Sequence, residues 1–364
     1  MKQETLEQFD PILENPNIAA LVMRQCLKPV EGDNAVIFPP TYAGIGYNID
    51  TFNTAGETRN VCVIDSVGSQ ANRMEPLFKT PPYDDLVPHI KVTVRKQPLK
   101  GQEEGDLIEE IDLLDVGHRI ADAVVRFSNG ADEISQAFQS VQKDATKMAE
   151  LAPTSLVFGC WDSRGSSVKL PRIVRSTITA YNVYQLKRSA QYVPATERYE
   201  EVFDKLSEKE RKKFADVGMT HVPSTEKPGG VFLDSNSRVQ KDVILSLSAL
   251  RALRSESDEN TVKLRRYLFG LSLVAVTAPQ NPLLRMGCEL TLDSQNPAKW
   301  EIVGCDGKRQ TFDLSFERAL TYAKAVAEAF GVGESKAFTF DPKKANEELK
   351  KLTEKGKKGE EGQP

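Results

Sequence analysis

The sequence predicts an α+β protein in which short strands alternate with amphipathic helices. Apolar runs of strand length, such as Val61–Ile64, lie between segments with helical spacing, such as Leu314–Phe330. The 364 residues allow one large or two ordinary domains, and a hydrophobic content of 40% is sufficient for a core. No apolar run approaches the roughly 18 residues that a membrane span needs. We therefore expect a protein that is not inserted in a membrane.

The N-terminal part of the chain predicts one helix that carries a polar stripe. The elements expected in order are a helix over 4–28, a strand over Ala35–Phe38, a loop rich in Gly, Asn and Thr over 41–60, a strand over Val61–Ile64, and a helix that Ser66 caps and Pro76 ends. On that last helix, Val67, Ala71 and Met74 are expected to pack inward.

Ser69, Asn72 and Arg73 share the opposite stripe of this helix. One cation and two neutral hydrogen-bonding groups can hold a phosphate, and the helix N-terminus adds a favourable dipole. The alternative is a capped surface helix with ordinary polar residues, which the spacing alone favours.

The segment that follows predicts a small helical insertion between strands. Its expected elements are a strand over His89–Arg95, a helix over Asp112–Phe127 and a second helix over Ala131–Leu151.

The stretch from Ser155 to Tyr192 is locally basic in an acidic protein. It holds six Lys and Arg residues and one Asp, whereas the whole chain has a formal net charge of −4. We expect a buried strand at Leu156–Phe158, a glycine turn over 162–167 and an extended run from Val168. With strand spacing, one face of this run is apolar apart from Arg172. The other face carries Lys169, Arg175, Thr177, Thr179 and Tyr181.

A cationic sheet face of this kind suggests a long anionic partner. A solvated strand face whose cations serve solubility explains the same pattern equally well.

The rest of the chain predicts a charged excursion followed by mixed elements. They are, in order, an exposed helix over 196–217, a strand over Gly229–Leu233, a helix over Lys241–Leu253, a helical segment over Leu264–Leu268, strands over Leu271–Ala278, Arg285–Leu292 and Trp300–Val303, a helix over Leu314–Phe330 that Gly331 ends, and a charged, flexible tail from Lys343.

Residue patterns typical of catalysis are missing from the sequence. The three histidines lie outside any metal-binding spacing, and no phosphate-binding glycine loop or nucleophile elbow occurs. We therefore expect a binding protein with no catalytic residue, no metal and no cofactor. The five widely spaced cysteines favour reduced thiols, and the N-terminus lacks an apolar signal region, so a cytoplasmic location is expected.

Several long motifs resemble one known family. They are DSVGSQANRMEP, LLDVGHRIADAVVRFS, FGCWDSRGSSVKLPRIVRSTITAY, RRYLFGLSLVAVTAP and LLRMGCEL, which lie in family order between Ile12 and Phe330. They are similar to the backbone subunit of the type I-G (formerly I-U) CRISPR Cascade, in the Cas-seven family of the RAMP superfamily.

The resemblance implies a modified RNA-recognition-motif, or ferredoxin-like, palm with inserted helical fingers and a thumb excursion. Mapped on this chain, the parts are palm over 1–76, fingers over 77–150, palm over 151–185, thumb over 186–228, palm over 229–340 and a flexible charged tail over 341–364.

The resemblance also implies a function. Copies of such a subunit polymerise along a CRISPR guide RNA, join other Cascade subunits and present the guide for pairing with target DNA. Binding a guide of any sequence requires contacts to phosphate and ribose. The residues expected to make them are Ser69, Asn72, Arg73, Arg164, Lys169, Arg172 and Arg175, with Tyr42 and Tyr181 as candidates for stacking on bases.

Two other functions stay open from the sequence. Type III relatives cut target RNA with a loop aspartate and a metal ion, and Asp162 or Asp50 would be the candidate here. The third possibility is an oligomeric scaffold without nucleic acid, against which the basic stretch argues.

Overall fold

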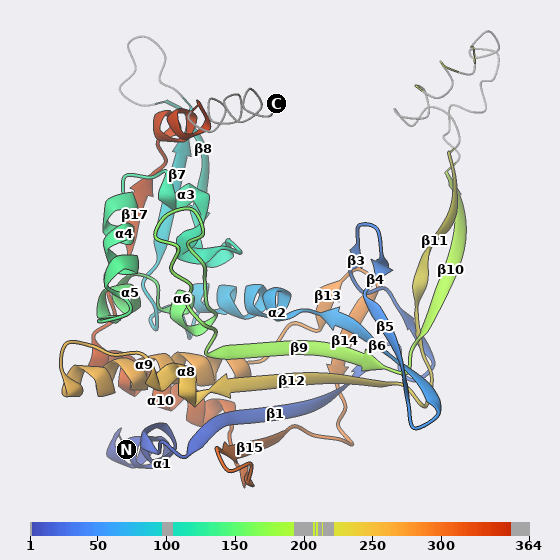
Figure 1. Cartoon of the computed structure of the whole chain (residues 1–364), viewed down its shortest axis with the longest axis horizontal. Helices are drawn as coiled ribbons and strands as arrows, with labels where there is room; N and C mark the ends of the chain where they lie inside the picture. The colour runs from blue at the N-terminus through green and yellow to red at the C-terminus, as the bar shows by residue number, and fades with distance from the viewer. Residues whose placement is uncertain are drawn as a thin grey trace, which may run out of the picture.

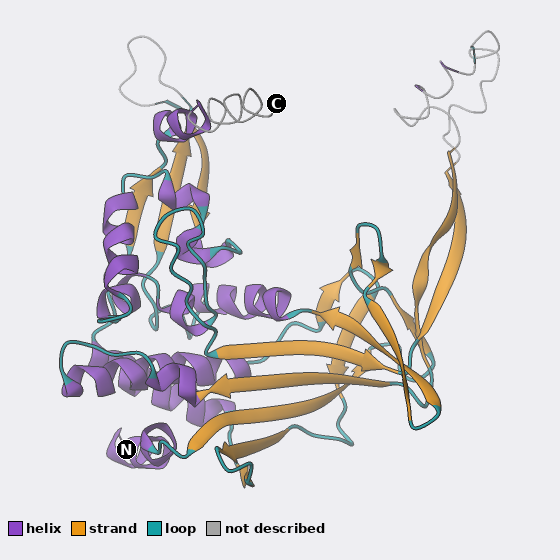
Figure 2. Cartoon of the chain, in the orientation of Figure 1, coloured by secondary structure: helices purple, strands orange, loops and turns teal. Residues whose placement is uncertain are grey.

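The computed structural model describes residues 2–96, 105–192, 207, 209, 213 and 222–350. Helices and strands are interleaved along the chain, which confirms the predicted α+β class (Figures 1 and 2). The largest unit is a nine-stranded sheet in the order β13-β14-β1-β12-β9-β6-β5, with β15 beside β1 and β16 beside β15. Its strands are β1 (Ile18–Pro29), β5 (Ile49–Thr54), β6 (Glu57–Asp65), β9 (Val174–Tyr181), β12 (Arg238–Ser246), β13 (Leu283–Arg285), β14 (Cys288–Leu292), β15 (Lys299–Gly304) and β16 (Arg309–Phe312).

The two faces of the sheet differ as the spacing of β9 predicts. Val174, Ile178 and Ala180 are buried on one face, whereas Arg175 is exposed on the other. Cross-strand partners share a face, so one buried row runs Gln25, Lys241, Ile178 and Asp65 across β1, β12, β9 and β6. Three of the four members of this buried row are polar.

The N-terminal helix is shorter than expected. α1 (Lys2–Glu14) ends before Asn15-Pro16-Asn17, and β1 follows where the sequence predicted more helix. Pro16 disfavours the helical conformation at Asn15, and the amide of Ile18 closes a turn by donating to the Asn15 carbonyl. The prediction of a helix over 4–28 was therefore wrong for its second half.

Helix α2 (Val67–Met74) forms where it was predicted, with Ser66 as the N-cap. Ala71 and Met74 are buried, and the 3-10 turn η1 (Glu75–Lys79) replaces the helix at Pro76. The apolar run Leu156–Phe158, expected as a strand, instead belongs to α6 (Pro153–Val157) and the residue after it. Pro153 favours a helix start, and an apolar run this short fits either structure.

Three further helices pack against one another at one end of the sheet (Figure 1). They are α8 (Leu247–Arg251), α9 (Asp258–Thr277) and α10 (Phe316–Phe330). α10 ends at Gly331 as predicted, with a left-handed φ of 81°. Tyr267 of α9 stacks on Phe330 of α10 with ring centroids 4.5 Å apart.

The predicted helix over Lys241–Leu253 was wrong for its first half, since only Leu247–Arg251 is helical, and the predicted strand over Leu271–Ala278 was wrong. Lys241 lies in strand β12, where this charged residue on the buried face hid the period-two pattern. Leu271–Ala278 was expected as a strand, but Leu271–Thr277 forms the end of α9 and Ala278 caps it. That part of α9 is apolar on all sides because it is buried on all sides, and so it shows no helical period.

A second, three-stranded sheet has the order β17-β7-β8 and lies beside helices α3 to α5 (Figure 1). The elements are β7 (Ile90–Arg95), β8 (Leu107–Asp112), β17 (Lys336–Thr339), α3 (Ala123–Arg126), α4 (Ala131–Ser140), α5 (Thr146–Leu151), and the 3-10 turns η2 (Leu113–Asp115) and η3 (Arg119–Ala121). The predicted helix over Asp112–Phe127 is therefore a series of short turns, and the one over Ala131–Leu151 is two helices.

Hairpins project from the other end of the main sheet (Figure 2). β10 (Tyr184–Tyr192) and β11 (Val222–Leu233) form the long one, which also pairs with β2 (Ala35–Ile37). The predicted loop over 41–60 was wrong, because it forms the β3–β4 hairpin (Thr41–Tyr42, Gly46–Tyr47), all of β5 and the beginning of β6. Most of the charged stretch over 196–217 lies outside the described residues, so its predicted helix stays untested.

Residues 342–350 are helical, and the rest of the charged tail lies outside the described residues. None of the described helices is long and apolar enough to cross a membrane. All five cysteines carry free thiols. The division into palm, fingers and thumb stays a prediction.

Candidate nucleic-acid interface

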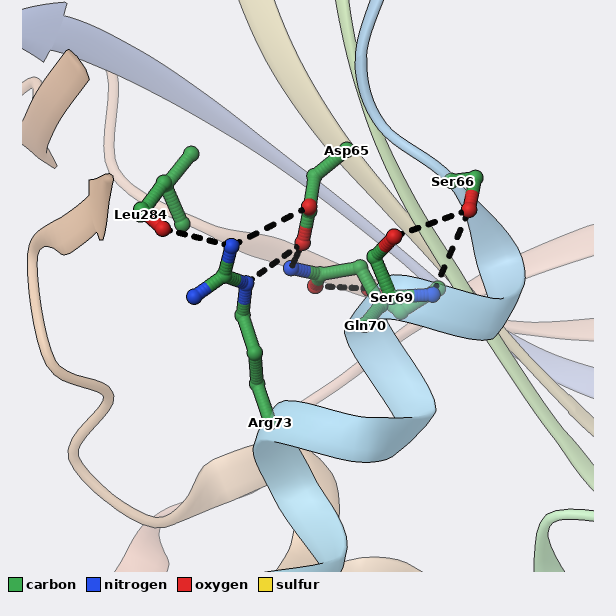
Figure 3. A network of polar contacts seen from close by, with 7 residues as sticks. Asp65, Ser66, Ser69, Gln70, Arg73 and Leu284 are labelled. Carbon is green, nitrogen blue, oxygen red and sulfur yellow. Dashed lines mark hydrogen bonds and ion pairs between the residues drawn. The ribbon is translucent and has the colours of Figure 1, made fainter. Parts of the chain in front are cut away.

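Helix α2 carries a polar network that ties Arg73 to the protein itself (Figure 3). The Asp65 carboxylate is buried and accepts hydrogen bonds from Arg73 Nε at 2.9 Å and from Gln70 Nε2 at 2.7 Å. Arg73 also donates to the Leu284 carbonyl at 2.7 Å, and Ser69 Oγ lies 3.1 Å from Ser66 Oγ. The charge of Arg73 is therefore largely compensated inside the molecule.

Asn72 points to a second buried ion pair. Its Oδ1 accepts a hydrogen bond from Arg119, whose Nε lies 2.7 Å from Glu75 Oε2. Burial raises the pKa of Glu75 to about 7, and the Arg119 guanidinium opposes that shift. Ser69, Asn72 and Arg73 thus each have a hydrogen-bond partner within the protein. Their contact with RNA stays a prediction.

The glycine turn after Trp161 is organised by Asp162. Its carboxylate accepts hydrogen bonds from the amides of Gly165 and Ser166 and from the Ser166 hydroxyl, at 3.0, 2.6 and 2.8 Å. These are the contacts of a turn-capping aspartate. Among the described residues, no three His, Cys, Asp or Glu side chains group as metal ligands.

Trp161 is a surface residue that the sequence reading missed. It is 59% exposed, its backbone bridges to Lys169, and the Lys169 ammonium lies 5.7 Å from its ring centroid. An exposed aromatic ring beside a cation can stack on a nucleic-acid base. The signal available in the sequence was an aromatic residue directly before a basic glycine turn.

Arg172 links this turn to α2. The strand β9 begins at Val174, so Arg172 precedes the sheet and does not lie on its core face as the predicted register had it. Its guanidinium donates to the Val67 carbonyl in the first turn of α2 at 3.4 Å. Burial, and then the nearby Arg119, lowers the pKa of Arg172.

The predicted site residues divide over separate surfaces. α2 covers the buried face of the sheet, since Ser176 donates to Gln70 at 2.7 Å. The neighbouring Arg175 therefore points to the opposite face, as does Tyr181, which lies under Arg238 at 4.7 Å. Tyr42 lies on the β3–β4 hairpin. Arg73 and Arg175, both predicted to contact RNA, therefore lie on opposite sides of the sheet.

Four cations of the central stretch keep their charge available. Arg164, Lys169, Arg172 and Arg175 form no ion pair with any residue in the described part of the chain. Arg164 and Lys169 are exposed beside Trp161, and Arg172 joins them to the start of α2. This group, Trp161 with Arg164, Lys169 and Arg172, is called the turn surface below. It combines positive charge with an exposed aromatic ring.

Comparison with known protein families gives a match to part of the chain. Residues 21–185 match the model of a family described as CRISPR-associated protein GSU0053. The matched range is less than half of the chain, but it contains α2, the turn surface and β9. No curated protein matches the chain.

Among solved structures, the chain is similar to the crystal structure of Csc2 from Thermofilum pendens. The two share 13% sequence identity and a TM-score of 0.29, over 94% of this chain and 78% of the Csc2 chain. A likeness at this level carries no conclusion about function.

Proposed function

We infer that the protein is a guide-RNA-binding backbone subunit of a CRISPR surveillance complex, of the type I-G Cascade. The observation that carries the inference is the match of residues 21–185 to a CRISPR-associated family. In this proposal the chain has the family's RNA-recognition-motif-like palm. Copies assemble along one guide with other Cascade subunits and offer it to target DNA.

The turn surface supplies the chemistry that such a role needs. Cations that have no ion-pair partner contact phosphates without reading bases, which suits a guide of any sequence. An exposed tryptophan adds stacking on a base, worth about 1–3 kcal/mol and tolerant of base identity. The protein acts by binding, and the capped position of Asp162 supports a role without RNA cleavage.

Tryptophan fluorescence tests this function directly. The chain has two tryptophans, of which Trp161 is exposed and Trp300 is buried. Adding single-stranded RNA of mixed sequence should quench emission in the wild type, because a base stacks on Trp161. Trp161→Phe keeps only the Trp300 emission and should show no quenching. RNA binding is measured in parallel by filter retention.

The possible outcomes separate the site from the function. RNA retained with unchanged emission would show that Trp161 is not the stacking residue. A purified chain that takes up no RNA, alone or with its partner subunits, would overturn the proposed function. Loss of binding to some sequences only would contradict a backbone grip.

A further inference from the structure

A cavity of about 1000 Å³ lies over the buried face of the sheet, between α2 and the β13–β14 hairpin. Among the described residues that line it, Lys241 and Arg73 are the charged ones, and none is an Asp or Glu. Gln25 and Gln70 add amide groups to its floor. Because Asp65 compensates Arg73, Lys241 is the charge that makes the cavity favour an anionic group.

Lys241 lacks a hydrogen-bond partner although it is buried. Its exposed fraction is 8%, and its ammonium donates no hydrogen bond to any described group. Asp65 is nearby in the same buried row, but its carboxylate already accepts hydrogen bonds from Arg73 and Gln70. Lys241 lines the cavity, so a carboxylate that enters the cavity can pair with its ammonium.

The walls and rim of the cavity are aliphatic. Val30 and Leu292, which line it, are more than half exposed, and Leu283 is nearly half exposed. Exposed aliphatic patches mark protein interfaces, whereas single-stranded RNA is held by aromatic stacking and solvent-facing cations. The partner that fits is thus a protein segment with an acidic and an apolar side chain close together.

Strand β8 of the same chain has this composition. Leu107 and Ile108 are both more than half exposed, and Glu109 beside them forms no ion pair with a described residue. Asp106 and Glu110 are instead paired with Lys96 and Lys91. Among the described strands β8 pairs with β7 alone, so one of its edges is free.

We propose that the cavity over β1 and β12 receives the β8 edge of a second copy of this chain, with Glu109 against Lys241 and the aliphatic side chains against the walls. Figure 1 shows β8 far from β13 and β14, so a chain does not fill its own cavity. Because cavity and strand are different surfaces, the contact is head-to-tail and generates an open helical array. The inference rests on the proposed function, which requires copies to assemble along a guide.

Disulfide trapping tests the contact. One chain carries Ile108→Cys and a differently tagged chain carries Leu283→Cys, both with the exposed Cys305 changed to Ser. Oxidation of guide-assembled protein should give a mixed-tag covalent dimer. Ile108→Cys with Phe52→Cys, an exposed residue of β5, is the matched control and should give none. Assembly without the 108–283 product, or equal trapping at Phe52, would overturn the inference.

Charge variants give a second readout by sedimentation. Glu109→Lys and Lys241→Met should each weaken association of neighbouring copies at least about tenfold, because each removes one side of a buried charge pair. Glu256→Lys changes another exposed glutamate without an ion pair in the described chain, and should leave association unchanged. Unaltered association in Glu109→Lys would contradict the contact.

RNA binding is followed separately with an oligonucleotide too short to reach two copies. If the variants lose this binding instead of association, the cavity is an RNA site and the inference is wrong. If the wild type binds no RNA, the proposed function fails, and trapping of the RNA-free chain at high concentration then decides the contact by itself.

Discussion

Arg73 shows that the charge of a single residue depends on its neighbours in the fold. From the sequence it is a helix cation beside a cap, available to a phosphate. In the structure it lies between the buried Asp65 and the Leu284 carbonyl, so it holds α2 to β6 and β13. Removing it would leave a buried carboxylate short of a donor, which destabilises the fold whatever it does to RNA. Lys169 is the better probe of RNA contact.

Lys241 makes the free energy of unfolding depend on pH. Burial lowers its pKa to about 8, with Asp65 opposing the shift and the Arg73 guanidinium facing the same carboxylate. Unfolded lysine has a pKa of about 10.4. Between about pH 8 and pH 10 the unfolded chain therefore binds more protons than the folded one, so this residue makes the free energy of unfolding rise with pH, by up to roughly 3 kcal/mol.

Urea unfolding of wild type and Lys241→Met from about pH 7 to pH 10 measures this rise. The thiols of Cys62, Cys160 and Cys288, whose pKa burial raises to about 12, act in the opposite sense. They are present in both proteins, so the difference between the two isolates Lys241. A difference that stays constant with pH would contradict a buried, proton-releasing Lys241.

Neighbouring atoms lie much closer to α9 at Gly270 than to α2 at Gly68. A Cβ at Gly270 would lie 2.9 Å from the Ala323 backbone and 2.8 Å from Val326 Cγ2 of α10. A Cβ at Gly68 would meet nothing nearer than Ser66 Oγ at 3.8 Å. We expect Gly270→Ala to lower the free energy of unfolding by about 1–3 kcal/mol through overpacking.

Gly68→Ala is the matched control and should raise stability by up to about 1 kcal/mol, because alanine is the better helix former. Thermal or urea unfolding of the two variants gives both signs in one experiment. A neutral Gly270→Ala would mean that α9 and α10 can separate without cost.

At the scale of the whole molecule, the turn surface is the proposed place of polyanion binding, and the salt dependence of RNA affinity tests it. Lys169→Ala should lower the slope of log affinity against log salt concentration by about 0.7 for single-stranded RNA, because one phosphate contact is lost. Lys324→Ala removes an exposed cation from α10 and should leave the slope unchanged. Equal effects of both changes would indicate attraction by overall charge.

The sequence by itself determined the α+β class, the two faces of β9, the Ser66 cap, the end of α10 at Gly331 and the basic character of the central stretch. Each of these depends on neighbours a few residues apart, where periodicity and capping act. The resemblance to a CRISPR-associated family was also visible there, because it depends on motifs in order. Short apolar runs such as Leu271–Ala278 were ambiguous, since burial on all sides removes the period that separates strand from helix.

Only the tertiary structure decided which charges are available and where they lie. Asp65 forms an ion pair with Arg73, and the sheet separates Arg175 from α2. β12 buries Lys241, which has no hydrogen-bond partner in the described chain. Trp161 became a candidate only when its side chain proved exposed beside Lys169. These facts depend on contacts between segments far apart along the chain, and the energy of a charge is set by its surroundings in space.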